Sequence, residues 1–129
     1  MVTRDRFEQG LTMRQYIDGM RMNRERFARA LDAAVIRPED AKILDRLAGT
    51  ARVLVITEDW CGTSLAHVPF VARLLEGRPD IDVRVFMRDD NPDIMEQYLK
   101  RGMYRSIPVF VFFDAEMNEI ARFIEERPA

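Results

Sequence analysis

The sequence places one reactive side chain, Cys61, where an apolar segment runs into a predicted helix, in the stretch EDWCGTS. It is the only cysteine of the 129 residues. A thiol at a helix N-terminus faces unpaired backbone N–H groups and the positive end of the helix dipole, which favour thiolate over thiol. Thiolate attacks disulfides, so the position suits a nucleophile. The same position also suits a small buried side chain without chemistry.

The residues around Cys61 narrow that chemistry. Three positions later, where a dithiol site would carry its second cysteine, there is Ser64, so no intramolecular disulfide can form. Glu58 and Asp59 lie just upstream, and their charges oppose the effect of the helix dipole. The lone histidine, His67, is six residues away and would point to another side of the helix, so we do not expect it to act as a base.

Composition argues against several other kinds of function. The chain has 20 basic and 22 acidic residues and a formal net charge of -2, which does not favour nucleic-acid binding. Its longest apolar stretch, residues 107–113, is far shorter than the roughly 20 residues that span a bilayer. One cysteine and one histidine cannot build a zinc site, and the acidic residues within 89–93 fit a capped helix start. We therefore expect that the protein binds no metal, cofactor, nucleic acid or membrane. We also expect it to be cytoplasmic.

Hydrophobic periodicity predicts the elements that position Cys61. Residues 12–34 have the pattern of one amphipathic helix, which opens with a capping box at Thr12 and Gln15. A second helix is predicted from Pro38 to Gly49. The segments expected after it are strand 52–57, helix 62–76, strand 81–87, helix 91–102, strand 107–113 and strand 120–124. This order, β-α-β-α-β-β preceded by two helices, predicts an α/β fold with a mixed central sheet of about four strands.

Two separated motifs resemble the thioredoxin-like superfamily. They are the tryptophan–cysteine–glycine of EDWCGTS and the isoleucine–proline of SIPVFVFF, in the right order and with the right elements between them. Pro69, within the helix after the cysteine, belongs to the same resemblance. The resemblance implies a single thioredoxin-like domain over residues 1–129, with a core at 52–123 and a helical extension at 1–50. The two leading helices look like those of a bacterial subgroup.

The resemblance also implies roles for individual residues. Cys61 matches the attacking cysteine of the family's C-x-x-C motif, and Ser64 stands in place of the resolving cysteine, a C-x-x-S variant. Pro108 matches the family's cis-proline, which packs against the active cysteine. The substrate-binding positions implied in this way are Trp60, Gly62, Thr63, Ile107 and Pro108.

A single thiol has a narrow repertoire. Cys61 would attack a mixed disulfide of a protein or a low-molecular-weight thiol and be released by an external thiol, or it would shuffle disulfides as an isomerase. The alternative is a non-catalytic peptide- or protein-binding module whose groove lies around Trp60 and Ile107. A third reading is a sensor in which Cys61 is oxidised to a sulfenic acid.

The apolar stripe of the helix predicted at 12–34 must also be buried. We expect it to pack over the sheet or its edge as part of the fold, because an apolar sheet face left in water would be a large exposed patch. The alternative is that the stripe meets its copy in a second subunit. The protein would then be a homodimer through its N-terminal helices rather than a monomer.

Overall fold

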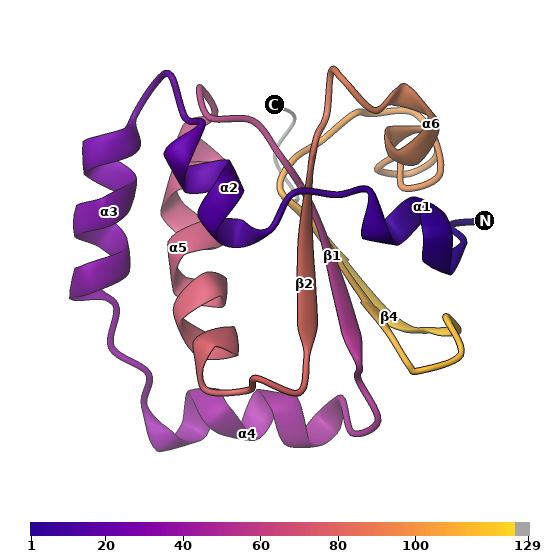
Figure 1. Ribbon diagram of the computed structural model, residues 1–129, viewed down its shortest axis with the longest axis horizontal. Coiled ribbons are helices and arrows are strands. Elements are labelled where there is room, and N and C mark those ends of the chain that lie inside the picture. Colours follow the sequence, from indigo (N-terminus) through magenta and orange to yellow (C-terminus); the bar gives the residue numbers. More distant parts are fainter. Residues whose placement is uncertain (126–129) are drawn as a thin grey trace.

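The computed structural model describes residues 1–125 and contains a mixed sheet with helices on both faces (Figure 1). Its strands are β1 (Arg52–Thr57), β2 (Asp82–Met87), β3 (Val109–Phe113) and β4 (Glu119–Ile124), in the order β2-β1-β3-β4. β1 runs parallel to β2 and antiparallel to β3, and β3 runs antiparallel to β4. The predicted α/β fold with a four-stranded mixed sheet is therefore confirmed.

β1 lies inside the sheet, and its alternate side chains belong to two different cores. Leu54 and Ile56 pack on one face of the sheet, Val53 and Val55 pack on the other, and all four are fully buried. A strand covered on both faces must be apolar throughout, which explains why RVLVIT shows no alternation. Because β1 and β2 are parallel, their carboxyl ends lie side by side, and the loops that follow them meet at the same end of the sheet.

The helices form two unequal layers. They are α1 (Arg4–Glu8), α2 (Met13–Asp18), α3 (Arg24–Ala33), α4 (Pro38–Arg46), α5 (Gly62–Glu76) and α6 (Pro92–Met95). α2, α3 and α5 cover one face with α4 across their end, and α1 and α6 lie on the other face (Figure 1). Among residues 1–125, no helix has the length and apolar character needed to cross a membrane.

The prediction of one continuous helix over residues 12–34 is wrong. The segment is divided into α2 and α3 by a turn at 19–23. α2 ends at Gly19, a residue with low helix propensity, and Asn23 adopts a left-handed conformation with φ 62°. The N–H groups freed by the break bind Asp59, a partner far away in sequence. Periodicity alone cannot reveal such a partner.

The apolar stripe of this segment is buried within its own chain, as expected. α2 begins with the predicted capping box, in which Thr12 and Gln15 exchange hydrogen bonds of 2.9 and 3.1 Å. The rings of Tyr16 and Phe27 meet edge to face with centroids 5.8 Å apart, so α2 and α3 are joined by their own side chains. The buried cluster that includes both rings also contains Met20, Leu44, Leu47, Val53, Val55, Val68, Leu75, Ile81, Val85, Phe110 and Phe112.

The prediction of a helix over residues 91–102 is also wrong, because the helix observed there is shorter. Only α6 is helical, and the chain continues as turns of the i→i−3 kind, such as the bond of 3.0 Å from the N–H of Tyr98 to the carbonyl of Met95. Turns of this kind place apolar side chains at much the same spacing as an α-helix does. Asn91 does not cap α6 with its side chain, because its amide oxygen accepts a hydrogen bond of 2.8 Å from Arg6.

α1 is an element that the sequence pattern does not predict. Its Phe7 is fully buried, and Val2 just before the helix is 2% exposed, so both belong to the core beneath α6. Thr3 caps the helix by accepting a hydrogen bond from the N–H of Arg6. The Arg6 guanidinium also holds Asp93 of α6 through two bonds of 2.9 and 3.0 Å. Five helical residues with one buried aromatic ring give too short a pattern for periodicity to detect.

Residues 10 and 11 cover the outer edge of β2. The backbone groups of Leu11 exchange hydrogen bonds of 2.9 and 2.7 Å with those of Val85. Gly10 permits this approach, since a Cβ atom there would lie 2.6 Å from the Phe86 ring. The N-terminal segment therefore contributes to the sheet edge as well as to both cores.

Candidate active site

Cys61 is the N-cap residue of α5, the position that the sequence predicts. Its backbone is extended, its carbonyl accepts a hydrogen bond of 3.0 Å from the N–H of Leu65, and its own N–H donates to the Glu58 carbonyl. Cys61 therefore begins a helix of 15 residues, although its thiol makes no capping hydrogen bond to the first N–H groups. Cys61 is only 5% exposed, so little of the residue is open to a reacting partner.

The core behind the cysteine contains the residue before the predicted cis-proline. Cys61 and Ile107 belong to the same buried cluster, on the α1 and α6 face of the sheet. The Ile107–Pro108 peptide bond is cis. Pro108 is buried at the start of β3, where it also lines a cavity on the opposite face. The structure thus brings together the two predicted motifs, which are 46 positions apart in the sequence.

The remaining predicted site residues differ in exposure. Trp60 is 42% exposed, Gly62 is exposed and Thr63 is half-buried, so these three form surface beside the cysteine. Ser64 is 1% exposed, and within residues 1–125 its hydroxyl oxygen has no hydrogen-bond partner. A buried hydroxyl that no other side chain or backbone group binds keeps both its donor and its acceptor capacity.

Asp59 connects the cysteine loop to the N-terminal helices. Its carboxylate accepts hydrogen bonds of 2.8 and 3.3 Å from the backbone N–H groups of Arg21 and Met22. Its carbonyl accepts a bond of 2.9 Å from the side-chain amide of Asn23. The negative charge that the sequence places near Cys61 is therefore committed to the turn between α2 and α3. That turn becomes a neighbour of the cysteine loop.

Glu58 is a nearly buried carboxyl group, 7% exposed, immediately after β1. One of its oxygens accepts a hydrogen bond of 3.0 Å from the backbone N–H of Asp89, in the loop after β2. Burial raises the pKa of Glu58 above its ordinary value, and the bond from Asp89 only partly opposes this shift. The carboxylate is thus less stable in the folded protein than in the unfolded chain.

The Glu58→Gln variant should therefore be stabilised at neutral pH. An acid whose pKa is raised on folding lowers stability as pH climbs through the window from its unfolded to its folded pKa, and the loss persists above that window. Glutamine keeps the acceptor for Asp89 and removes the charge. Urea unfolding should give the variant a higher free energy of unfolding than the unsubstituted protein at neutral pH. This difference should disappear near the ordinary glutamate pKa of about 4.3. A difference that widens toward acid would contradict the raised pKa.

Arg88 is a site residue that the sequence reasoning missed. Its guanidinium carbon lies 5.0 Å from the centroid of the Trp60 ring, and its Nη1 donates a hydrogen bond of 3.1 Å to the carbonyl of Arg105. The signal was present in the sequence, because Arg88 directly follows the strand predicted to lie parallel to the one before Cys61. The carboxyl ends of parallel strands meet at one end of a sheet.

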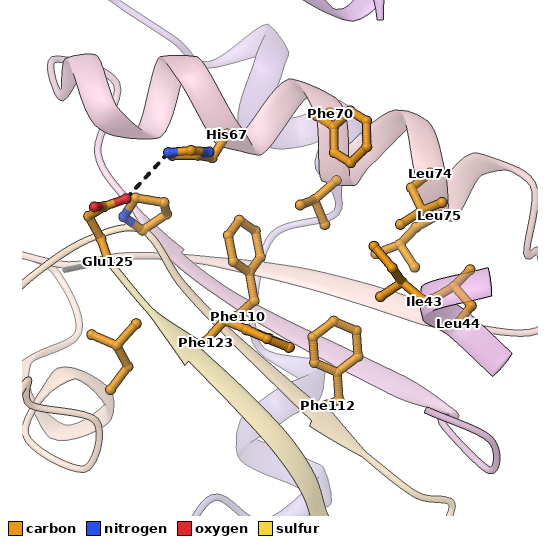
Figure 2. Close-up of a pocket in the computed structure, with 13 residues that line it drawn as sticks. Ile43, Leu44, His67, Phe70, Leu74, Leu75, Phe110, Phe112, Phe123 and Glu125 are labelled. Carbon is orange, nitrogen blue, oxygen red and sulfur yellow. Dashed lines mark ion pairs between the residues drawn. The ribbon is translucent and has the colours of Figure 1, made fainter. Parts of the chain in front are cut away.

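A separate apolar cavity of about 340 Å³ lies between α5 and the strands β3 and β4 (Figure 2). At one end of the cavity, His67 Nε2 lies 3.3 Å from Glu125 Oε2. The partner of His67 is therefore Glu125 and not Cys61. The lining residues are Ile43, Leu44, His67, Phe70, Val71, Leu74, Leu75, Pro108, Phe110, Phe112, Phe123, Ile124 and Glu125. Within the described part of the chain, His, Cys, Asp and Glu side chains form no group of three that could hold a metal ion.

Comparison with known proteins agrees with this geometry. A protein of unknown function from Pseudomonas aeruginosa has a crystal structure similar to this one, with a TM-score of 0.77 and 22% sequence identity over 99% of this chain and 79% of that one. An HIV epitope scaffold matches with a TM-score of 0.73 and 21% identity over 92% of this chain and 73% of its own. At these identities the likeness shows the fold alone. The curated proteins contain no match to this chain.

The sequence itself matches a family model. The model is described as thioredoxin, and its match covers residues 10–129, which include α2 to β4 and the Cys61 loop. The match therefore extends over the N-terminal helices as well as the sheet. On that match, which covers nearly the whole sequence, the chain belongs to the thioredoxin family.

Proposed function

We propose that this protein carries out thiol–disulfide exchange through Cys61 alone, as a monothiol oxidoreductase or isomerase. The observation that carries the proposal is the position of the chain's only cysteine, at the N-cap of α5 and in one cluster with Ile107 before the cis Pro108. The exposed surface next to the thiol, at Trp60 and Gly62, is where a substrate would approach it.

The exchange needs no second cysteine. The Cys61 thiolate attacks one sulfur of a substrate disulfide, a new disulfide forms between Cys61 and that sulfur, and the other sulfur leaves as a thiolate that takes a proton from solvent. An external thiol then attacks the mixed disulfide and releases Cys61 as a thiolate. One disulfide is broken and one is formed in each step, so the protein undergoes no net oxidation.

Ser64 supports the thiolate without being able to resolve the intermediate. It lies on the first turn of α5, three residues after the N-cap, and residues three apart on a helix are neighbours. Its hydroxyl is buried and has no hydrogen-bond partner among residues 1–125, so its proton is available to the sulfur anion that forms during exchange. The substrate class is a protein disulfide or a mixed disulfide with a small thiol, and the reductant is a small thiol of a reducing, cytoplasmic compartment.

The test is capture of the mixed disulfide. The folded protein is mixed with a peptide whose one cysteine carries a thiopyridyl leaving group, and release of thiopyridone and the protein–peptide adduct are followed by absorbance and mass spectrometry. We expect one adduct per chain, abolished by Cys61→Ser and reversed by glutathione with recovery of the free protein. An adduct that forms only after denaturation would show that the native thiol does not react.

A second candidate is a binding module with an incidental cysteine, and the 5% exposure of Cys61 favours it. In that case the exposed Trp60 and the surface around it would hold a peptide without forming a covalent bond to it. The two candidates differ in a simple comparison. A binding module should retain a peptide equally well with and without Cys61→Ser, whereas the exchange protein should lose the captured peptide with this substitution.

A further inference from the structure

We propose that the apolar cavity between α5 and the strands β3 and β4 binds a small-molecule amine, whose apolar body lies among the aromatic rings and whose ammonium group lies at Glu125. The volume of the cavity, about 340 Å³, is within the range of small-molecule sites in proteins. Its most deeply buried lining residues belong to the core on the α5 face of the sheet, whereas Cys61 belongs to the core on the other face. The proposal therefore does not depend on exchange at Cys61.

The cavity has apolar walls and one polar end (Figure 2). Figure 2 shows α5 along one side and the strands along the other, with Ile43 of α4 at one end and the pair of His67 and Glu125 at the opposite end. The apolar side chains drawn and labelled along the two sides are Phe70, Leu74, Phe110, Phe112 and Phe123. Such rings offer large apolar contact surfaces, so the body that fits between them is aromatic or aliphatic.

The α5 wall leaves apolar surface that the described chain only partly covers. Val68 and Ala72 of α5 are buried, whereas Phe70, Val71 and Leu74 are half-buried and line the cavity. A helix that is apolar on several sides is ordinarily covered on all of them. A bound apolar molecule would remove this remaining surface from water, and that removal is the main source of binding free energy in such a site.

Glu125 determines the charge that the site accepts. It is the only acidic residue among the described residues of the lining, which include no lysine or arginine. Its side chain is 14% exposed, and its backbone N–H donates a hydrogen bond of 3.2 Å to the carbonyl of Pro108, another lining residue. A carboxylate fixed at the end of an apolar cavity is complementary to a cation and repels an anion.

The contact with His67 leaves Glu125 able to bind an ammonium group. His67 Nε2 lies 3.3 Å from one carboxylate oxygen, and its side chain is 55% exposed, so this end of the cavity is open to solvent. A carboxylate has about four acceptor sites on its two oxygens. An ammonium group can therefore enter beside the imidazole, or displace it, and bind the carboxylate with charge-assisted hydrogen bonds.

The experiment uses three probes that share one body and differ in the head group. They are 4-phenylbutylamine, 4-phenylbutanol and 4-phenylbutyrate, which are a cation, a neutral molecule and an anion at neutral pH. The full-length protein is labelled at its methyl groups, and NMR titrations give both the location and the affinity of each probe. The signals of Val71 and Leu74 should shift, and those of Leu54 and Ile56, on the other face of the sheet, should not.

We expect the amine to bind at least about tenfold more tightly than the alcohol, because a hydrogen bond to a largely buried charge is among the stronger ones in proteins. The acid should bind more weakly than the alcohol. Glu125→Gln should bring the affinity for the amine to within about twofold of that for the alcohol. Glu76→Gln is the matched control, since Glu76 also pairs with a cation, Arg73 at 3.1 Å, but lies outside the lining; it should leave all three affinities unchanged.

Phe123→Ala tests the apolar part of the site separately from its charge. It should weaken all three probes by a similar factor, about threefold or more, and keep the preference for the amine. A preference for the acid, an amine preference that survives Glu125→Gln, or shifts that appear away from the cavity would each overturn the proposal. So would a lack of binding by all three probes. A dimer in sedimentation, with Val71 and Leu74 signals that follow protein concentration rather than the amine, would show that a second copy covers the cavity instead.

Discussion

The Phe27→Ala substitution is expected to lower the free energy of unfolding by about 3–5 kcal/mol, the range found when large aromatic rings are removed from cores. Phe27 lies on α3, is 1% exposed and meets the Tyr16 ring edge to face. It belongs to the cluster that contains Val53 and Val55 of β1. A ring at this place joins the N-terminal helices to the central strand. Its loss leaves a cavity that the sheet cannot close, and urea unfolding followed by circular dichroism measures the effect.

Phe123→Ala is the matched control for this experiment. Phe123 has the same side chain but is 53% exposed on the edge strand β4, where it contacts the Phe112 ring. We expect the free energy of unfolding to fall by less than about 1.5 kcal/mol, since only part of the apolar surface of the Phe123 ring is buried. If Phe27→Ala proved no more destabilising than Phe123→Ala, the helices α2 and α3 would be a detachable extension. Their packing on the sheet would then contribute little to stability.

The strands of the sheet and the helix start at Cys61 could be predicted from the sequence because their signals are local. RVLVIT is apolar at every position, as a strand buried on both faces must be. The turn into α5 occurs at Cys61, and the helix that follows carries few charges before Glu76. The second motif begins at Ile107, and the cis bond to Pro108 lies there. The strand and the helix start depend on neighbouring residues, so a short window of sequence contains them, whereas the cis bond was expected from the resemblance to the thioredoxin-like superfamily.

The features that sequence analysis missed depend on partners far along the chain. The break between α2 and α3 is held by Asp59, which is 36 positions from Asn23 in the numbering. Arg88 reaches the Arg105 carbonyl across the space between two loops. α1 has a single fully buried ring, Phe7, whose partners come from the sheet and α6. In each case a tertiary contact satisfies polar groups or apolar surface that the local pattern leaves undecided.

Glu58 and Asp59 have tertiary partners that a local electrostatic argument leaves out. From the sequence, Glu58 and Asp59 should weaken a thiolate at Cys61 through their charge. In the structure Asp59 is occupied by the N–H groups of Arg21 and Met22, and burial shifts the Glu58 pKa toward the neutral acid. Both carboxyl groups therefore also hold loops together, Asp59 the turn between α2 and α3 and Glu58 the loop after β2.

The Ser64→Cys substitution should convert the site from a monothiol into a dithiol. Ser64 lies on the first turn of α5, three residues after Cys61, where helix neighbours have Cβ atoms about 5–6 Å apart and small shifts reach disulfide geometry. Its hydroxyl has no partner among the described residues, so replacing it with a thiol breaks no hydrogen bond. The introduced thiol would attack the mixed disulfide at Cys61 and free the substrate. We expect reduction of insulin disulfides at least about tenfold faster than with the unsubstituted protein, since an intramolecular thiol has a high effective concentration.

Ser64→Ala separates the new thiol from the lost hydroxyl. It should keep the fold, because an unpaired buried hydroxyl contributes no favourable bond, and it should gain no reductase activity. The oxidised Ser64→Cys protein is then digested, and mass spectrometry identifies the peptide that contains both thiols; a bond to Cys61 lowers its mass by two hydrogens. A Ser64→Cys protein that folds normally but keeps both thiols free under a strong oxidant would contradict the expectation. It would place the sulfur of Cys61 too far from the first turn of α5 for resolution, and would leave release by an external thiol as the only route to turnover.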